Sequence, residues 1–215
     1  MHFKNIHEPT TTITDFILAL MGFAFGISLL SVYQEKQFAF HFYWGWGFIV
    51  SGLGAFVGAI SHGIGPNLNV KINHIIWKVT VFLIGVSGWY FSIGASIFFF
   101  PPATYEWVRW IIIISLVFYS LWLFKDDRFI VVILYYIPLM IFIMTGMFYH
   151  FLVLNSAGSA AVAVGILVSL GGAGIQASGF SIHKYFNHND LFHVIQMIGY
   201  LLMFQGGMEI GIYGV

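Results

Sequence analysis

The sequence has 215 residues, of which 60% are hydrophobic and only 7% are charged. Soluble domains carry about 25% charged residues, so this composition fits a chain that is solvated mainly by lipid. The formal net charge is zero, which gives no electrostatic reason to expect a nucleic acid partner. The absence of cysteine excludes disulfides, thiolate metal ligands and a cysteine nucleophile. We therefore expect an integral membrane protein whose first partner is the lipid bilayer.

Seven apolar stretches are long enough to cross a bilayer as helices, because a span needs about 20 residues. They cover roughly 13–33, 42–63, 75–99, 105–124, 129–149, 156–178 and 190–212. The connections are short and contain turn-forming residues, so consecutive helices should be antiparallel neighbours. The sequence predicts an all-α polytopic membrane protein, with residues 1–215 forming a single seven-helix transmembrane domain.

The Lys and Arg residues predict the orientation of this bundle. With seven spans, the N-terminus shares one side of the membrane with every second loop, and Lys and Arg are more frequent there. That side carries Lys4, Lys71, Lys78, Lys125, Arg128 and Lys184, and the other carries Lys36 and Arg109. Because basic residues favour the cytoplasmic side, we expect the N-terminus inside and the C-terminus outside. A plasma membrane or a bacterial inner membrane is expected, and the oligomeric state stays open.

The same parity gathers most ionisable side chains of the helix ends on one side. They are Glu8, Asp15, His62, His74, Lys78, His188, Asp190 and His193. An ionisable residue in a membrane span is costly and by default suggests a function. His62 and His193 each lie about one turn inside a helix, on a stripe of small or polar residues. These stripes predict that both imidazoles face neighbouring helices.

Two of the acidic residues also fit a structural interpretation. Thr12-x-x-Asp15 and Asn187-x-x-Asp190 have the spacing of capping pairs at helix N-termini. A carboxylate in the first turn is favoured there by the positive end of the helix dipole. Capping is therefore an alternative to a catalytic role for each of them.

Histidines brought together at one end of the bundle suggest a metal centre. His62 and His193 could ligate Zn²⁺ through neutral nitrogens, and a catalytic zinc site has three protein ligands and an open position for water. His74, His188 or Asp190 could supply the third ligand, and spacing does not decide among them. A single interfacial histidine is commonly structural, which is the alternative for His74 and His188. A b-type haem between His62 and His193 is a further alternative.

Seven helices with a histidine ending the second and a polar histidine motif opening the seventh resemble the alkaline ceramidase and adiponectin-receptor (CREST) superfamily. The resemblance implies a seven-helix membrane hydrolase that cleaves an amide in a lipid. It implies zinc held by one histidine of helix 2 and a His-x-x-x-His pair of helix 7. His62 matches the first of these ligands and His193 the last. Asn189 replaces the other helix-7 histidine, and Gly58 replaces a helix-2 serine.

The N-terminal segment carries a second part of this resemblance. Glu8-Pro9-Thr10 followed by Asp15 is similar to the Glu-Pro-Asn…Glu segment that binds calcium in ceramidases. The spacing is shorter here, and Thr replaces Asn. The resemblance implies a Ca²⁺ site near Glu8 and Asp15.

Two functions therefore compete. The first is a ceramidase-like, zinc-dependent hydrolase of lipid amide or ester bonds, with the metal lowering the pKa of a bound water. In it, Asp190 or Asp15 acts as general base or orients the imidazoles. The alternative is a non-enzymatic seven-helix receptor or small transporter, in which histidines, Asp15 and Lys78 line a polar vestibule.

Overall fold

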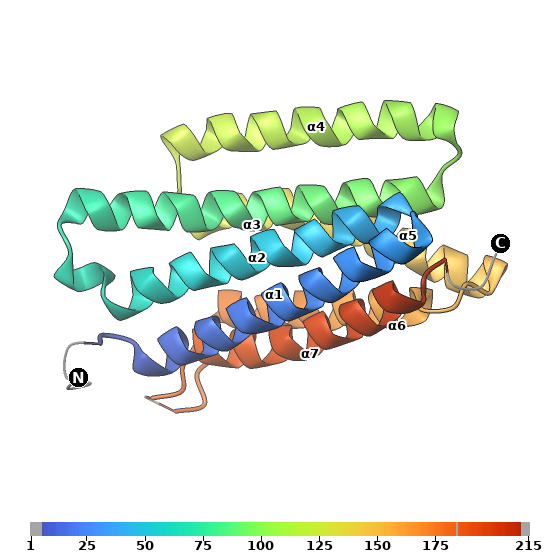
Figure 1. The fold of residues 1–215 in the computed structure, drawn as a ribbon. Coiled ribbons are helices and arrows are strands. Elements are labelled where there is room, and N and C mark those ends of the chain that lie inside the picture. Colours follow the sequence, from blue (N-terminus) through green and yellow to red (C-terminus); the bar gives the residue numbers. More distant parts are fainter. Residues whose placement is uncertain (1–5, 184, 212–215) are drawn as a thin grey trace.

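A computed structural model describes residues 6–183 and 185–211, which fold into seven α-helices (Figure 1). The helices are α1 Pro9–Lys36, α2 Ala39–Gly63, α3 Val70–Phe99, α4 Pro102–Lys125, α5 Phe129–Leu154, α6 Ser159–Ser178 and α7 His188–Glu209. A 3-10 turn, Gly65–Asn67, follows α2, and the described residues contain no β-strand. The predicted all-α, seven-helix fold is confirmed.

All seven helices are long and apolar enough to cross a membrane. Several extend beyond the apolar stretches because favourable first turns add to them. Pro9 opens α1 at a position where proline is well tolerated. Asn69 caps α3 by accepting the backbone N–H of Lys71 at 2.9 Å, so that helix begins at Val70 rather than 75. The predicted end of the last helix, residue 212, lies outside the described residues.

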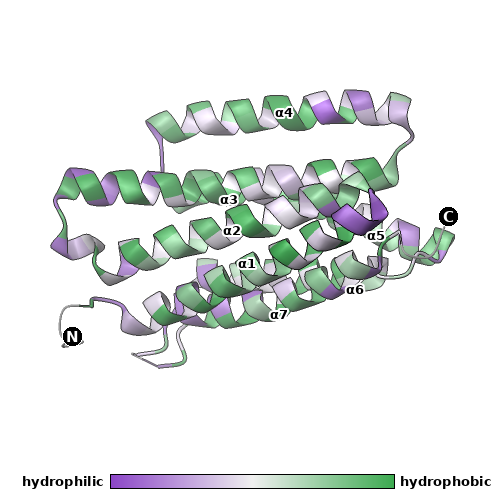
Figure 2. Ribbon diagram, viewed as in Figure 1, coloured by the Kyte–Doolittle hydropathy of each residue, from purple (hydrophilic) through white to green (hydrophobic). Residues whose placement is uncertain are grey.

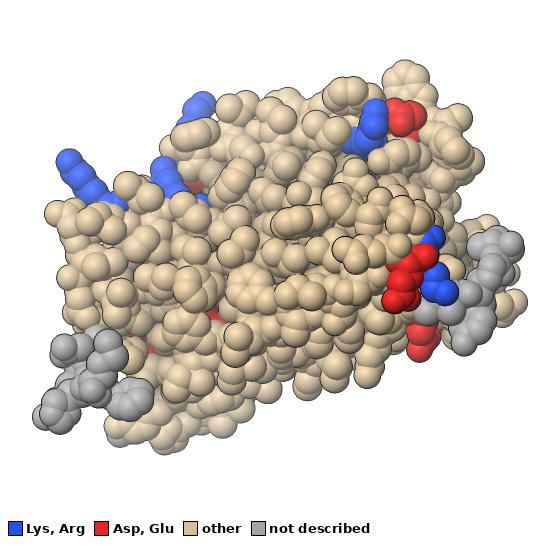
Figure 3. Space-filling model, viewed as in Figure 1, with Lys and Arg blue, Asp and Glu red and all other residues tan. Residues whose placement is uncertain are grey.

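Charged residues gather at the two ends of the bundle, and the broad middle is apolar (Figure 2, Figure 3). The chain start and the α2–α3, α4–α5 and α6–α7 connections lie at one end, as the parity of the spans predicted (Figure 1). Of the basic residues counted for that side, Lys4 and Lys184 lie outside the described residues. Length, apolarity and charge distribution together describe a multi-pass membrane protein.

The helices form a ring with one helix outside it. In the ring α1 packs on α2, α2 on α3, α3 on α5, α5 on α6, α6 on α7 and α7 on α1, whereas α4 lies against α3 (Figure 1). Glycine makes two of these contacts close. A Cβ at Gly22 of α1 would lie 2.7 Å from the carbonyl oxygen of Phe48, and one at Gly165 of α6 would lie 2.7 Å from that of Gly199. Small residues thus let α1 approach α2, and α6 approach α7, at backbone distance.

Aromatic side chains fill the ring at the end where α2 begins. Phe40, Trp44, Phe48 and Phe91 are fully buried and lie in stacked or edge-to-face contacts with one another. The indole N–H of Trp44 donates to the carbonyl oxygen of Phe91 at 3.2 Å. This set of residues, called the aromatic end below, holds α2 and α3 together around a solid interior.

Candidate functional site

A cavity of about 420 Å³ lies inside the ring at the opposite end. Every helix except α4 contributes to its wall. Along α2 the wall runs from His62, near the helix end, to Ser51, which is about 16 Å away at 1.5 Å per residue. Ligand sites in proteins measure about 300–1,000 Å³, so this space is large enough for a small molecule.

The cavity wall is polar at one end and largely apolar beyond it. The polar end is formed by Asp15, His62, Gln176, His188, Asn189 and His193. The apolar wall includes Leu18, Ile84, Val132, Ile133, Ile137, Met140 and Leu170. Deeper in the bundle, the hydroxyls of Ser51 and Tyr200 are hydrogen-bonded to each other. The space therefore suits a molecule with a polar head and an apolar body.

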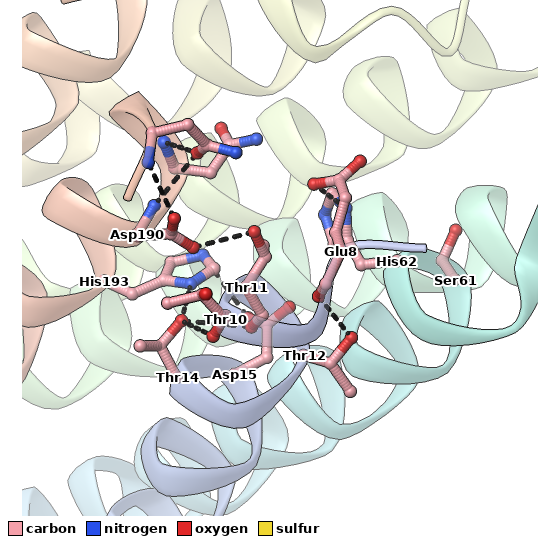
Figure 4. A network of polar contacts seen from close by, with 12 residues as sticks. Glu8, Thr10, Thr11, Thr12, Thr14, Asp15, Ser61, His62, Asp190 and His193 are labelled. Carbon is pink, nitrogen blue, oxygen red and sulfur yellow. Dashed lines mark hydrogen bonds and ion pairs between the residues drawn. The ribbon is translucent and has the colours of Figure 1, made fainter. Parts of the chain in front are cut away.

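A buried ion pair between α1 and α7 forms part of the polar end. His193 Nε2 lies 3.3 Å from Asp15 Oδ1, and both side chains are more than nine-tenths buried. The other ring nitrogen of His193, Nδ1, lies 2.9 Å from the hydroxyl of Thr14. Figure 4 shows Thr14 and Asp15 on the same turn of α1, both directed at this imidazole. Both nitrogens of His193 are therefore engaged by α1.

Asp190 lies beside this pair and holds the start of α7 against α1. Its Oδ1 accepts the hydroxyl of Thr11 at 2.7 Å, and its Oδ2 accepts the backbone N–H of Asn187 at 2.7 Å. The Asn187 side chain accepts the backbone N–H groups of Asn189 and Asp190, which completes a capping box. The capping interpretation of Asp190 is confirmed, and its side chain is not part of the cavity wall.

The start of α1 also contacts the end of α2. His62 Nδ1 lies 3.2 Å from Glu8 Oε2, and the backbone N–H of His7 donates to the carbonyl oxygen of Gly63 (Figure 4 for the Glu8–His62 pair). Thr12 donates its hydroxyl to the carbonyl oxygen of Glu8, and α1 has no side-chain cap. The predicted Thr12–Asp15 capping pair is therefore wrong. Because α1 begins several residues earlier than predicted, Asp15 lies inside the helix and is directed at α7.

The histidines considered as ligands do not all meet. His74 Nδ1 lies 3.4 Å from Asp127 Oδ2, beside the α4–α5 connection, with about half of its side chain exposed. His188, at the first position of α7, contributes to the polar end of the cavity together with His62 and His193. Three of the four histidines thus reach one region of the bundle, and His74 does not.

The arrangement of these groups does not fit the implied metals. Within the described ranges, no three or more His, Asp or Glu side chains are placed to hold one metal ion. Both ring nitrogens of His193 contact α1 side chains, Nδ1 at Thr14 and Nε2 at Asp15. Glu8 lies against His62 and Asp15 against His193, so the two carboxylates do not face each other. The zinc site at His62 and His193 and the Ca²⁺ site at Glu8 and Asp15 have no matching donor set here, and they stay predictions.

Sequence reasoning missed the threonines that organise this site. Thr11 and Thr14 bond to Asp190 and His193, two of the ionisable side chains in the first turns of α7. The signal was present in the run Thr10-Thr11-Thr12-Ile13-Thr14 at the start of an apolar helix. Positions 11, 14 and 15 have the i, i+3, i+4 spacing that places side chains on one helix face.

Comparison with known proteins places the chain in a family. Residues 10–211 match the model of a family of unknown function, DUF6962, and the chain belongs to that family. No curated protein and no solved structure matches it.

Proposed function

We propose that this protein binds an amphipathic small molecule in the cavity, as a seven-helix receptor or small transporter would. The head group would contact the polar end at Asp15, and the apolar body would lie along the wall that α5 contributes. The observation that carries this proposal is a cavity of about 420 Å³ with ionisable side chains at one end and a mostly apolar wall along α5.

The buried Asp15–His193 pair supports a functional use of this end. Both side chains are more than nine-tenths buried, and ionisable groups inside membrane spans are costly and mark binding or transport sites. Replacing a buried ion pair by well-packed apolar residues is often neutral or stabilising, so stability does not explain the pair. Elsewhere along the same two helices, Leu29 of α1 and Met203 of α7 belong to one buried apolar cluster, so α1 and α7 do not need an ion pair in order to pack.

A pair of tryptophan substitutions on α6 tests the proposal. Ala173 lies in the cavity wall, whereas a Cβ at Gly171 would have no neighbour within 4 Å. Ala173→Trp should fill the cavity and abolish the binding of single-chain amphiphiles, detected by native mass spectrometry of protein released from nanodiscs. Gly171→Trp is the control, because it adds the same indole side chain outside the cavity, and it should bind these amphiphiles as the wild type does. Equal binding by the wild type and Ala173→Trp would overturn the proposal.

A zinc-dependent lipid hydrolase is the second candidate. The observation in its favour is that His62, His188, His193 and Asp15 contribute to the same end of the cavity, where the CREST resemblance puts the metal. Metal analysis of the purified protein by mass spectrometry tests it. Stoichiometric zinc that disappears in the His62→Ala/His193→Ala double variant would support the hydrolase, and its absence from the wild type would remove that candidate.

We further propose that the N-terminus faces the cytoplasm of a plasma membrane or bacterial inner membrane. The support is the excess of Lys and Arg at the end of the bundle where the chain starts. Because the sequence has no cysteine, single cysteines can report the orientation. A membrane-impermeant maleimide added to intact cells should label Lys36→Cys and leave Lys71→Cys unlabelled. The reverse pattern would invert the orientation.

A further inference from the structure

The contacts of His193 determine how many protons the Asp15–His193 pair carries. The Thr14 hydroxyl has one proton, and its oxygen lies 3.1 Å and 3.0 Å from the carbonyl oxygens of Thr10 and Thr11. If that proton is donated to one of these carbonyls, the Thr14 oxygen must accept from His193 Nδ1–H. The contact between His193 Nε2 and Asp15 Oδ1 then needs a second proton, carried by one of the two groups. In this state the pair is neutral overall.

Rotation of the same hydroxyl gives the alternative state. When Thr14 donates to His193 Nδ1, the imidazole carries its only proton on Nε2, which faces Asp15 Oδ1 at 3.3 Å. Asp15 is then an ionised carboxylate beside a neutral histidine, and the pair has a charge of minus one. The two states differ by one proton and use the same side-chain positions. The pair can therefore gain or lose a proton by rotation of the Thr14 hydroxyl alone.

The second oxygen of Asp15 is available to a ligand. Among the residues that the structure describes, no hydrogen bond reaches Asp15 Oδ2, and the side chain is more than nine-tenths buried. A Cβ added at Gly58 would lie 3.4 Å from this oxygen and 3.5 Å from Thr80 Cγ2. Asp15, Gly58 and Thr80 all belong to the cavity wall. The missing side chain at Gly58 therefore leaves space between Oδ2 and α3.

The charges around that space favour a cation. No Lys or Arg is part of the cavity wall. Lys78 lies between the wall residues Trp77 and Thr80 in the sequence of α3, but it is not itself a wall residue. The carboxyls of Glu8 and Asp190 act on Asp15 as like charges from α1 and α7. The other titratable groups at this end are imidazoles, His62 from α2 and His188 and His193 from α7. An anionic head group would meet carboxylates without a fixed positive charge.

Gln176 adds an acceptor on the part of the wall that α6 contributes. Its side-chain nitrogen donates to Asn189 Oδ1 at 3.1 Å, which leaves Oε1 as the free end of the amide. This oxygen is buried and has no hydrogen-bond partner among the described residues. An ammonium group has three N–H donors and could satisfy such acceptors, whereas a carboxylate or phosphate could not.

We infer that the ligand is a cationic amphiphile, a long-chain amine in its ammonium form, and that it exchanges with the proton of the Asp15–His193 pair. The inference rests on the proposed function and adds the chemical class of the ligand. The ammonium binds Asp15 Oδ2, Thr14 turns its hydroxyl to His193 Nδ1, and the proton of the pair leaves to solvent. One positive charge enters and one leaves, so the total charge of the cavity is unchanged.

Titration calorimetry in neutral-lipid nanodiscs tests the exchange, with dodecylamine as the probe and empty nanodiscs as the reference. An alkylamine stays protonated from pH 6 to 8, because its pKa is close to that of lysine, about 10.4. Titrations in two buffers of different ionisation enthalpy should show one proton released for each amine bound. Affinity should fall as the pH falls, by up to tenfold per unit, because protons compete for the same pair.

Matched probes and variants identify the group responsible. Dodecanol and dodecanoate, with the same chain, should bind at least tenfold more weakly and release no proton. Asp15→Asn should bind dodecylamine more weakly and without proton release, because the carboxylate that holds the ammonium is gone, and His193→Gln should bind it without proton release. Glu106→Gln, which removes an exposed carboxylate at the other end of the bundle, should behave as the wild type.

The outcomes separate the two proposals. Amine binding without proton release, or equal binding of all three probes, would overturn the exchange and leave the amphiphile site standing. Binding of none of the probes to the wild-type protein would overturn the proposed function itself. Unchanged proton release in both Asp15→Asn and His193→Gln would show that another group exchanges the proton, which contradicts the inference.

Discussion

The two ends of the helix ring use the same helices in opposite ways. At its start, α2 directs Phe40, Trp44 and Phe48 into a solid aromatic cluster. Farther along, it has Gly54 and Gly58 in the wall of a cavity. The change from large to small residues along α2 contributes to this difference, together with the other five helices that line the cavity.

The polar contacts also differ between the two ends of the ring. At the aromatic end, the Trp44 indole bonds to a backbone carbonyl that belongs to the same packed cluster. At the hollow end, Thr11 and Thr14 of α1 bond to Asp190 and His193 of α7, and Asp15 lies directly against His193. These bonds hold α1 against α7 where little apolar packing is available. Substitutions at each end should therefore differ in their effect on the free energy of unfolding.

The largest effect is expected from removing the centre of the aromatic end. Trp44→Ala deletes a fully buried side chain and its hydrogen bond, so the free energy of unfolding should fall by about 3–5 kcal/mol. Ile137→Ala, in the cavity wall, removes a half-buried side chain that already faces a hollow, and should cost about 1 kcal/mol. Reversible unfolding in mixed micelles measures both. Equal losses would mean that the cavity is packed as tightly as the aromatic end.

The bond network at the hollow end should give the next largest effect. Asp190→Ala leaves the Thr11 hydroxyl and the Asn187 backbone N–H without their acceptor, which should lower the free energy of unfolding by about 2–3 kcal/mol. Asn187→Ala removes only the helix cap and should cost about 1 kcal/mol. The same unfolding measurement ranks the two variants. A smaller loss for Asp190→Ala would contradict its role in joining α1 to α7.

The close contact of α6 with α7 should give an intermediate effect. Gly165→Ala places a Cβ 2.7 Å from the carbonyl oxygen of Gly199, so the helices must separate, at a cost of about 1–3 kcal/mol. Gly171→Ala, on the same helix, adds a Cβ with no neighbour within 4 Å and should be neutral or slightly stabilising. Thermal unfolding of the pair provides the test. An unchanged unfolding temperature for Gly165→Ala would mean that α6 and α7 are farther apart at Gly165 and Gly199 than this distance requires.

The smallest effect on stability, with a distinct effect on binding, is expected at Gly58. Its added Cβ would make ordinary contacts at 3.4 Å and 3.5 Å, so Gly58→Ala should change the free energy of unfolding by less than about 0.5 kcal/mol. The methyl group would occupy space beside Asp15 Oδ2, and dodecylamine affinity should fall about tenfold, which corresponds to about 1.4 kcal/mol. Calorimetry and unfolding on one preparation separate the two effects. Unaltered affinity would exclude this space as the head-group position.

The fold could be predicted from the sequence because lipid imposes strong constraints. The apolar stretches, their lengths and their parity were enough to predict seven antiparallel spans and the gathering of Asp15, His62 and His193 at one end. Helix limits were less accurate, since capping residues such as Asn69 extend a helix beyond its apolar part. Capping patterns were reliable where the predicted helix start was close to the real one, at Asp190, and failed at Asp15.

The contacts of the site could not be predicted because they form between helices. Spacing along one helix indicates a face, but it does not say which partner that face meets. The sequence therefore suggested that His62 and His193 share a metal, whereas the structure directs His62 to Glu8 and His193 to Asp15 and Thr14. The cavity depends on side chains from six helices, and no single segment carries a pattern that reveals it.

Photochemical labelling tests the central claim, an amphiphile site inside the ring, most directly. A dodecylamine that carries a diazirine on its chain would be irradiated with the protein in nanodiscs, and labelled residues would be mapped by mass spectrometry. We expect label on the cavity wall of α5, around Ile133 and Ile137, that unlabelled dodecylamine suppresses and Ala173→Trp removes. Label confined to the lipid-facing side of α4, around Phe118 and Leu121, and unaffected by competitor would contradict the account.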